Sequence, residues 1–271
     1  MSPLDAFPLD ASFPLNDRGL LLGDGLFETL LWTGEDLPYL DAHLSRMAAG
    51  CETLGLPVFD LERARALCRA APGEAGLDGV RAAVRLTLTA GSGGRGLDRP
   101  DAPAPRLAAG AAAAPPVTTP VDLMLAKTRR NEGSPAARLK TLSYLDNVLA
   151  RAEAKAAGAD EAVMRNNHGD LTCAAAANLF WIAEGRLFTP ALRCGVLSGL
   201  TRGRVLDAAR ALDVEVHEVS TGAEALDEAE AVFLTNSLIG LRPARRFEGE
   251  TFGPHALVER LDQVLRAPAT P

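Results

Sequence analysis

The chain has 271 residues, 47% of them hydrophobic and 23% charged, with a formal net charge of −7. This length allows one large domain or two ordinary ones, and the acidic balance without a basic stripe argues against a nucleic-acid binder. No apolar run approaches the roughly 18–20 residues that span a membrane. Residues 1–13 lack the basic start and long apolar core of a signal peptide, so we expect a cytoplasmic protein without membrane partners.

The first half of the chain alternates between strand and helix patterns. Residues 25–32 (GLFETLLW) predict a strand, and residues 40–54 place apolar side chains at helical spacing before a natural C-cap at Gly55. A second helix is expected around 60–71. Clean alternation over 80–90 (VRAAVRLTLTA) then predicts a strand with one buried face.

Residues 97–120 are rich in Pro, Ala and Gly. A strand is expected near 106–114, and 115–120 has the composition of an interdomain linker. This pattern predicts two domains, covering residues 1–117 and 118–271.

The second half mixes strands and helices without a regular βαβ rhythm, which favours an α+β fold over a doubly wound sheet. Apolar residues from Leu142 to Ala152 mark a helix that ends at Gly158, another helix follows Gly199, and a last one is expected near 255–266. The expected strands cover 121–127, 161–166, 178–183, 186–189 and 231–235.

The four cysteines are the first residues to consider for metal or redox chemistry. They form no CxxC pair and have no metal-ligand spacing with the four histidines. Reduced thiols and no metal site are therefore expected.

Lys140 is the first candidate for covalent chemistry. It lies in AARLKTLSYL, at a loop-to-helix boundary with apolar flanks. A partly desolvated lysine there would have a lowered pKa and a nucleophilic amine. Taken by itself, composition favours the simpler interpretation of a surface lysine at a helix start.

Three segments have the character of phosphate cradles. GSGGRG at 91–96 offers flexible backbone amides and Arg95, Gly199 to Arg202 open a helix, and 235–237 (TNS) end a strand with three polar side chains. Each pattern alone is more often a turn or a cap. Arg46, on the helix 40–54, either turns inward toward a phosphate or covers the helix surface.

Taken in order, these segments resemble one family. The matching pieces are DRGLLLGDGLFETL (17–30), HLSRM (43–47), RLKTLSYLDNVLARAEA (138–154), ANLFW (177–181), LFTP (187–190), GVLSGLTR (195–202) and TNS (235–237). Together they resemble the fold-type IV pyridoxal-phosphate enzymes, the class-IV aminotransferases, over roughly residues 16–245. The resemblance implies an N-terminal α/β sandwich, a C-terminal mixed α/β pseudo-barrel, pyridoxal 5′-phosphate as cofactor and a homodimer.

The resemblance also assigns roles to individual residues. It implies that Lys140 forms a Schiff base with the cofactor and carries protons. The cofactor-binding residues that it implies are Arg46, Cys173, Asn178, Leu200, Thr201, Asn236 and Ser237. Tyr144 is a further candidate near the cofactor ring, or a packing residue.

Within the family, GSGGRG and LKTLSYLDN most resemble aminodeoxychorismate lyase, which releases pyruvate from aminodeoxychorismate to give 4-aminobenzoate, a folate precursor. The resemblance implies a small carboxylate substrate, with Arg95 and Thr29 as substrate-binding candidates. Further arginine candidates are Arg129, Arg130 and Arg242. A D-amino-acid or branched-chain aminotransferase is the alternative in the same family.

One position departs from the family pattern. Where the family usually has a glutamate bonded to the pyridine nitrogen, five residues before the Asn of ANLF, this chain has Cys173. A thiol is a weak hydrogen-bonding group and cannot supply the same charge. A non-catalytic cofactor-binding homologue is therefore a third alternative, and neither Asp170 nor Glu161 is identified by sequence as a replacement.

Overall fold

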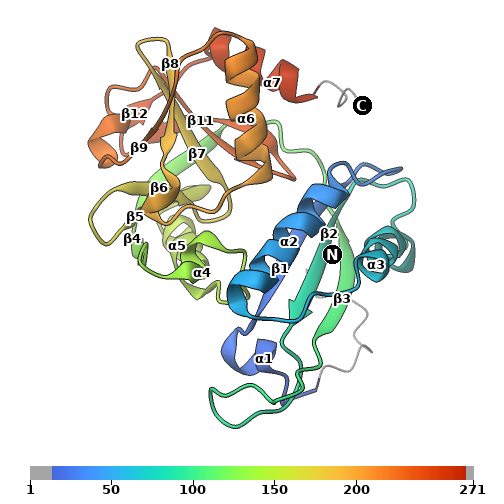
Figure 1. Cartoon of the computed structure of the whole chain (residues 1–271). Coiled ribbons are helices and arrows are strands. Elements are labelled where there is room, and N and C mark those ends of the chain that lie inside the picture. The colour runs from blue at the N-terminus through green and yellow to red at the C-terminus, as the bar shows by residue number, and fades with distance from the viewer. Residues whose placement is uncertain (1–13, 267–271) are drawn as a thin grey trace. The chain divides into compact units, whose positions relative to one another are not determined.

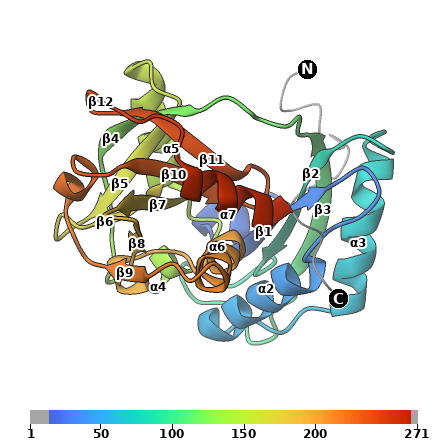
Figure 2. The ribbon, with the colours of Figure 1, turned by 90° about the horizontal axis from the view of Figure 1, so that it is seen from above.

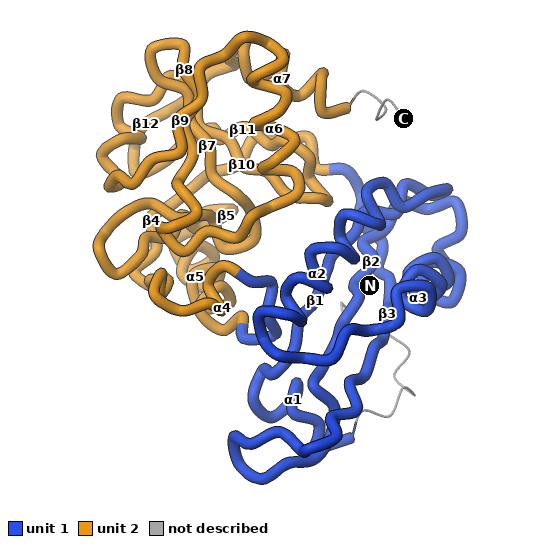
Figure 3. Tube along the Cα trace, viewed as in Figure 1, with its two compact units in different colours: residues 1–116, 139–143 blue, residues 117–138, 144–271 orange. Residues whose placement is uncertain are grey.

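The computed structural model describes residues 14–266, and the chain folds into two compact units (Figure 3). Unit 1 contains the described residues up to Pro116 together with Leu139–Ser143, and unit 2 contains Val117–Arg138 and the chain from Tyr144 onward. The N-terminal segment that was tested for a signal peptide lies outside the described residues. No helix of residues 14–266 is long and apolar enough to cross a membrane.

Unit 1 is an antiparallel sheet covered on one face by helices (Figures 1 and 2). Its strands are β1 (Gly25–Trp32), β2 (Ala82–Thr89) and β3 (Arg106–Ala113), in the order β1-β2-β3. Helix α2 (Leu40–Leu54) packs on β1, and α3 (Leu61–Glu74) packs on β2 and β3. The short helix α1 (Arg18–Leu22) precedes β1.

The predicted periodicities explain this packing. In β2 the alternate residues Val84, Leu86 and Leu88 are buried, and they meet the apolar stripe of α2 in one core. Helix α2 ends where Gly55 adopts φ 62°, a left-handed conformation that glycine reaches without strain.

Leu139–Ser143 joins unit 1 by pairing with the edge of β1. Phe27 N–H donates to Lys140 O at 2.9 Å, Leu142 N–H donates to Gly25 O at 3.0 Å, and Leu26 and Thr141 form an antiparallel bridge. The expected division after residue 117 stays a prediction, and the two compact units differ from it at this segment. Its backbone hydrogen bonds go to β1, which a division into two continuous segments could not represent.

Unit 2 contains one large mixed sheet. Within the described residues it has nine strands, in the order β6-β5-β4-β11-β10-β7-β8-β9, with β12 paired to β11. The pairs β4–β5, β4–β11 and β8–β9 are parallel and the others are antiparallel. The strands are β4 (Val121–Arg130), β5 (Glu161–Asn166), β6 (Leu171–Ala174), β7 (Asn178–Ala183), β8 (Arg186–Pro190), β9 (Val216–Val219), β10 (Ala231–Asn236), β11 (Gly240–Phe247) and β12 (Glu250–Thr251).

The helices of unit 2 pack on different parts of this sheet. Helix α5 packs on β4 and β5, α6 on β9 and β10, and α7 on β11 and α6. Helix α4 precedes Lys140, and the turns η2 and η3 are 3₁₀ helices. Their bounds are α4 (Pro135–Arg138), α5 (Leu145–Ala156), η2 (Leu192–Cys194), α6 (Leu200–Ala211), η3 (Ala223–Leu226) and α7 (Ala256–Arg266). This mixed architecture agrees with the predicted α+β class.

Helix α5 buries a different face from the one that its large apolar residues predict. Leu145 is 67% exposed and Val148 59% exposed, whereas Asn147, Ala150 and Ala154 are buried. The small alanines face β4 and β5, where a helix can approach the sheet closely. The apolar residues that marked the helix therefore do not mark its buried face.

Candidate functional site

Lys140 is held against the ring of Phe27. Its Nζ lies 4.1 Å from the ring centroid, and the guanidinium carbon of Arg85 lies 3.8 Å from the same centroid. The backbone hydrogen bond from Phe27 N–H to Lys140 O fixes the lysine beside β1. Thr29 pairs with Arg85 in the β1–β2 register, so Phe27, Thr29 and Arg85 share one face of the sheet.

Glu28 occupies the opposite, core face of β1, between Leu26 and Leu30. Its side chain is 1% exposed. Arg46 donates from Nε to Oε1 at 2.7 Å and from Nη2 to Oε2 at 2.6 Å, the two-pronged geometry that suits a carboxylate. His43 Nδ1 lies 2.7 Å from Oε2. The structure therefore pairs the predicted phosphate ligand Arg46 with a carboxylate that sequence reasoning did not single out.

These contacts alter the acidity of both Glu28 and Lys140. Burial acts to raise the pKa of Glu28, but the hydrogen bonds from His43 and Arg46 outweigh it and lower this pKa below its usual value. Burial lowers the pKa of Lys140 to about 8; Glu28 opposes this change, and Arg46 and Arg85 add to it. At pH 7 roughly a tenth of Lys140 is then a neutral amine, against well under a thousandth for an ordinary lysine.

The charge balance around Lys140 favours an anion. Arg46 and Arg85 both disfavour the positive charge of Lys140, and Glu28 favours it. An anion such as a phosphate or carboxylate would be attracted to these cationic side chains. Unit 1 thus combines a nucleophilic amine with an environment suited to anions.

In unit 2 the start of helix α6 carries the predicted residues Leu200 and Thr201. Its N-cap is Gly199, which has no side chain to cap the first turn. Thr201 is buried. The N–H groups of a first helical turn and the positive end of the helix dipole are suited to an anion.

Asn178 fixes the position of this helix start. Its Nδ2 donates to Thr235 O at 3.1 Å, and a Cβ atom added at Gly199 would lie 2.5 Å from the same Nδ2. Only glycine fits between Asn178 and the helix. Asn178 is therefore a packing and anchoring residue for the N-terminus of α6.

The polar residues at the end of β10 are used partly within unit 2. Asn236 donates from Nδ2 to Ala176 O at 2.9 Å, and its Oδ1 accepts from the N–H groups of Leu238 and Ile239. This side chain holds the β10–β11 turn. Ser237 lies in that turn and is half-buried.

Cys173 lies on β6 and is buried, with the Thr172 hydroxyl 3.8 Å from its sulfur. The two carboxylates that were considered as replacements for the family's glutamate, Asp170 and Glu161, are each held by another side chain. Asp170 is held by Asn166, through Asn166 Nδ2 at 3.0 Å, and Glu161 pairs with Arg151 at 3.1 Å. The cysteine therefore has no carboxylate replacement among these two neighbours.

The arginine candidates have distinct surroundings. Arg95 is exposed in the glycine-rich loop, and Arg129 donates to Asn166 O. Arg130 is buried and donates to Gly195 O, Asn147 Oδ1 and Ala137 O, so it acts as a structural donor. Arg242 donates to Thr119 O. Sequence reasoning missed Arg85, although its place among the polar positions of the 80–90 strand was visible.

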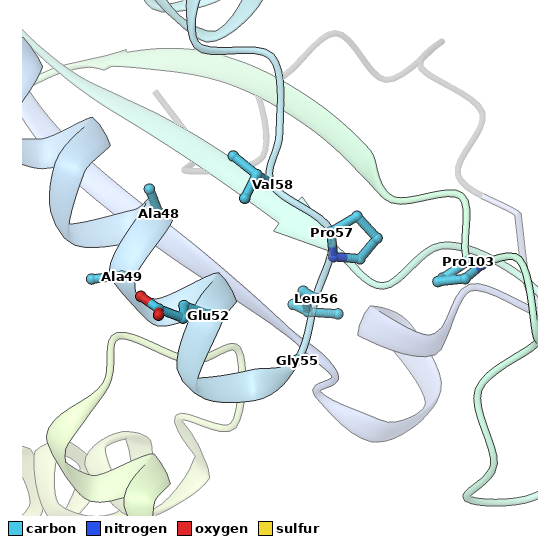
Figure 4. A pocket seen from close by; sticks show the side chains of 8 residues that line it. All are labelled: Ala48, Ala49, Glu52, Gly55, Leu56, Pro57, Val58 and Pro103. Carbon is cyan, nitrogen blue, oxygen red and sulfur yellow. The ribbon is translucent and has the colours of Figure 1, made fainter.

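A groove of about 810 Å³ lies on unit 1 beside the end of α2 (Figure 4). Its lining is mostly apolar and contains one charged side chain, Glu52. None of the predicted site residues lines it. The lining residues are Ala48, Ala49, Glu52, Gly55, Leu56, Pro57, Val58 and Pro103.

The buried positive charge of Lys140 should lower the free energy of unfolding of the cofactor-free protein. Its pKa is lower in the folded chain than in the unfolded chain, so between about pH 8 and 10.5 the unfolded state binds more protons and stability rises with pH. We expect Lys140→Met to be more stable than the wild type at pH 7 by about 3 kcal/mol, with the difference shrinking above pH 8. Urea denaturation of both proteins from pH 7 to 10 measures it; a constant difference would contradict the expectation.

Gly199→Ala should destabilise unit 2 by about 1–3 kcal/mol, because its Cβ would collide with the Asn178 amide. Gly203→Ala, in the same helix, is the matched control, since its Cβ would meet nothing within 4 Å. The control should gain up to about 1 kcal/mol from better helix propensity. Denaturation midpoints that move in the same direction for both variants would refute the close approach.

Comparison with known proteins identifies the relatives of this chain. A family model described as "Amino-transferase class IV" matches residues 25–247. Aminodeoxychorismate lyase of Vibrio harveyi is 28% identical over 235 residues, covering 85% of each chain. The structure of 4-amino-4-deoxychorismate lyase from Pseudomonas aeruginosa is 32% identical, with a TM-score of 0.83 and 96% coverage of both chains.

A branched-chain amino acid aminotransferase from Escherichia coli shares the fold. It has a TM-score of 0.85 at 23% identity and covers 94% of this chain and 88% of its own. The expected fold class and enzyme class are thereby confirmed. The chain belongs to the class IV aminotransferases, a family of fold-type IV enzymes that implies pyridoxal phosphate as the cofactor.

Proposed function

We propose that this protein is a pyridoxal-phosphate-dependent lyase that converts 4-amino-4-deoxychorismate to 4-aminobenzoate and pyruvate. The observation that carries the proposal is Lys140, a buried lysine whose pKa of about 8 leaves a nucleophilic amine at neutral pH. The substrate is suggested by relatives named as this lyase, which match nearly the whole chain at 28–32% identity.

The chain carries the groups that such a cofactor needs. Lys140 would hold it through a Schiff base. Arg46 in unit 1, and the first turn of α6 with Leu200 and Thr201 in unit 2, are each a candidate for binding its phosphate. When bound, the cofactor would supply an electron sink for the carbon that bears the amino group. Lys140, released from the cofactor, would take the proton from that carbon, and the product would gain aromaticity as pyruvate leaves.

The substrate carboxylates need cationic partners. Arg95 and Thr29 remain our proposed substrate contacts, and Arg85 is a further cation beside Lys140. The alternative is a D-amino-acid or branched-chain aminotransferase. It is suggested by a relative from Methanocaldococcus jannaschii, named as a putative branched-chain-amino-acid aminotransferase, which is 28% identical over 257 residues. It would require an amino acceptor and would not release 4-aminobenzoate.

Cys173 is the residue that fits the cofactor least well. A thiol cannot keep the pyridine nitrogen charged as a carboxylate would. An elimination that creates an aromatic ring depends less on that charge than an amino transfer does, so Cys173 agrees better with the lyase than with the aminotransferase. Total loss of catalysis, leaving a cofactor-binding homologue, is the third outcome to be tested.

The setting of the proposed reaction is also part of the proposal. A product of this kind is a folate precursor, and the family resemblance implies a homodimer. We propose the cytoplasm as its location. The four cysteines are free and buried, in keeping with a reducing compartment.

The lyase is tested by supplying the purified protein with pyridoxal phosphate and enzymatically generated aminodeoxychorismate. We expect a visible absorbance band and equal release of 4-aminobenzoate and pyruvate, and loss of the band and both products in Lys140→Ala. A band with product only from amino donors and keto-acid acceptors would establish the aminotransferase. A band without either product would indicate the non-catalytic homologue, and no band would refute cofactor binding.

Cys173→Glu should alter the two reactions unequally. A carboxylate near the pyridine nitrogen would strengthen the electron sink, so we expect amino-donor turnover to rise tenfold or more while the lyase rate changes less. Cys173→Ser, which introduces a small polar group without charge, is the matched control. Equal changes in both reactions, or a rise with serine, would contradict the assigned position of Cys173.

A further inference from the structure

The connection between β2 and β3 is much longer than these strands require. Thr89 and Arg106 are paired in their antiparallel register, and a hairpin at this point needs only about two to five residues. The chain instead runs through residues 90–105 and projects beyond the strands beside α1 (Figure 1). Loops of this length with contacts of their own are usually functional. This one carries the glycine-rich sequence 91–96, with Arg95.

Arg18 holds both ends of the 91–98 loop. Its backbone N–H donates to Gly91 O at 2.9 Å. Its guanidinium donates to three carbonyl oxygens at the other end of the loop, from Nη2 to Leu97 O at 2.8 Å and from Nη1 to Asp98 O at 3.0 Å and Gly96 O at 3.4 Å. Arg18 is only 4% exposed. The 91–98 loop is therefore closed around a buried guanidinium.

A buried carboxylate ties this guanidinium to the chain that leaves the loop. Arg18 Nε donates to Asp24 Oδ2 at 2.9 Å, and Arg99 donates from Nη2 to Oδ1 at 2.6 Å and from Nε to Oδ2 at 3.0 Å. Arg99 also donates to Leu54 O, at the end of α2, at 2.6 Å. Hydrogen bonds from Arg99 and Arg18 hold the pKa of Asp24 below its usual value, so this carboxylate keeps its charge at neutral pH.

Arg95 lies inside the closed loop. Its carbonyl accepts from Asp98 N–H at 3.1 Å, these two residues form an antiparallel bridge, and Arg95 is exposed. We propose that Arg18 is a positioning residue: by closing the 91–98 loop it holds Arg95 in the place where it binds a substrate carboxylate. The inference rests on the proposed function, in which Arg95 is a substrate contact.

The physical reason for such a residue is preorganisation. An arginine on an open loop loses conformational freedom when it binds a ligand, and this loss weakens binding. A loop that is already closed in the free protein loses less. Arginine suits the centre of the loop because the donors of its planar fork can bind several carbonyl oxygens at once.

The first test uses trypsin, which cleaves after arginine and lysine, on the full-length, cofactor-free protein. A closed loop must open locally before a protease can bind it, so we expect Arg18→Met to be cleaved after Arg95 about tenfold faster or more. Cleavage after Arg63, in α3 of the same unit, reports unfolding of unit 1 and should change little. Arg69→Met, which removes an exposed arginine of α3, is the matched control and should behave as the wild type.

Unchanged cleavage after Arg95 in Arg18→Met would overturn the proposal. If cleavage instead rises equally after Arg95 and Arg63, the substitution has destabilised unit 1 as a whole. A pair of glycine variants then decides whether the closed loop protects Arg95.

Gly94 offers a way to open the loop without replacing Arg18. A Cβ atom at Gly94 would lie 2.1 Å from Asp98 O and 3.0 Å from Arg18 Nη1. Gly93, with φ 103° against 82° for Gly94, is no easier for alanine, but its Cβ would meet only a proline side chain, at 3.8 Å. We expect Gly94→Ala, and not Gly93→Ala, to be cleaved faster after Arg95, with each rate divided by that of the unfolded variant. Equal corrected rates would contradict the closed loop.

The second test asks whether Arg18 acts through Arg95, which a purely structural role would not require. With the pyridoxal-phosphate-loaded protein, wild type, Arg18→Met, Arg95→Gln and the double variant are compared by KM and kcat for aminodeoxychorismate. We expect Arg18→Met to raise KM about tenfold and to change kcat less than about threefold. When Arg95 is already replaced, the same change should raise KM at most about twofold. A tenfold rise in both backgrounds would refute the positioning role.

Failure of the proposed function would be recognised separately. If the wild type releases no 4-aminobenzoate but transfers amino groups, the same four proteins are compared by the KM of the amino donor. If the wild type has neither activity, the proposed function and the substrate role of Arg95 are both wrong. The trypsin rates still decide whether Arg18 closes the loop, because they are measured without cofactor or substrate.

Discussion

The pairing of residues 139–143 with the edge of β1 is the constraint on which the candidate site depends. Two backbone hydrogen bonds and one bridge attach this short segment to unit 1, although the chain before and after it belongs to unit 2. Because Lys140 lies within the paired stretch, its backbone is as fixed as that of a strand residue. A reactive side chain on a rigid element keeps its geometry better than one on a free loop.

The same pairing explains how Lys140 becomes a reactive amine. Burial beside the ring of Phe27 removes water from its charge, and the nearby arginines repel that charge. Burial and the two arginines lower the pKa of Lys140, whereas Glu28 raises it. The pKa of about 8 is the result of these opposing effects.

Much of this could be read from the sequence. The alternation in 80–90 predicted β2 and its buried face, and the helix 40–54 ended at Gly55 as expected. Local patterns succeeded there because each element buries a face whose period matches its own geometry. Helix α5 shows the limit: Leu145 and Val148 suggested its buried face, but contact with the sheet selected the alanines.

The contacts among the candidate residues were missed for a related reason. Family resemblance named Lys140 and Arg46, but no local rule pairs a helix residue with a strand residue eighteen positions earlier. A signal was nevertheless present in the sequence. Glu28 occupies one of the alternate positions of β1 that are otherwise apolar, and His43 lies within the apolar stripe of α2.

Two polar residues on core-facing positions of adjacent elements indicate that they satisfy each other, because buried polar groups are almost always hydrogen-bonded. A search for two polar residues at core-facing positions of neighbouring elements would have predicted that Glu28 and His43 are in contact. The same rule explains why Arg130, buried among backbone carbonyls, belongs to the framework of unit 2 rather than to a substrate site. Burial with hydrogen bonds from Nε, Nη1 and Nη2 to framework oxygens is what marks Arg130 as a structural arginine.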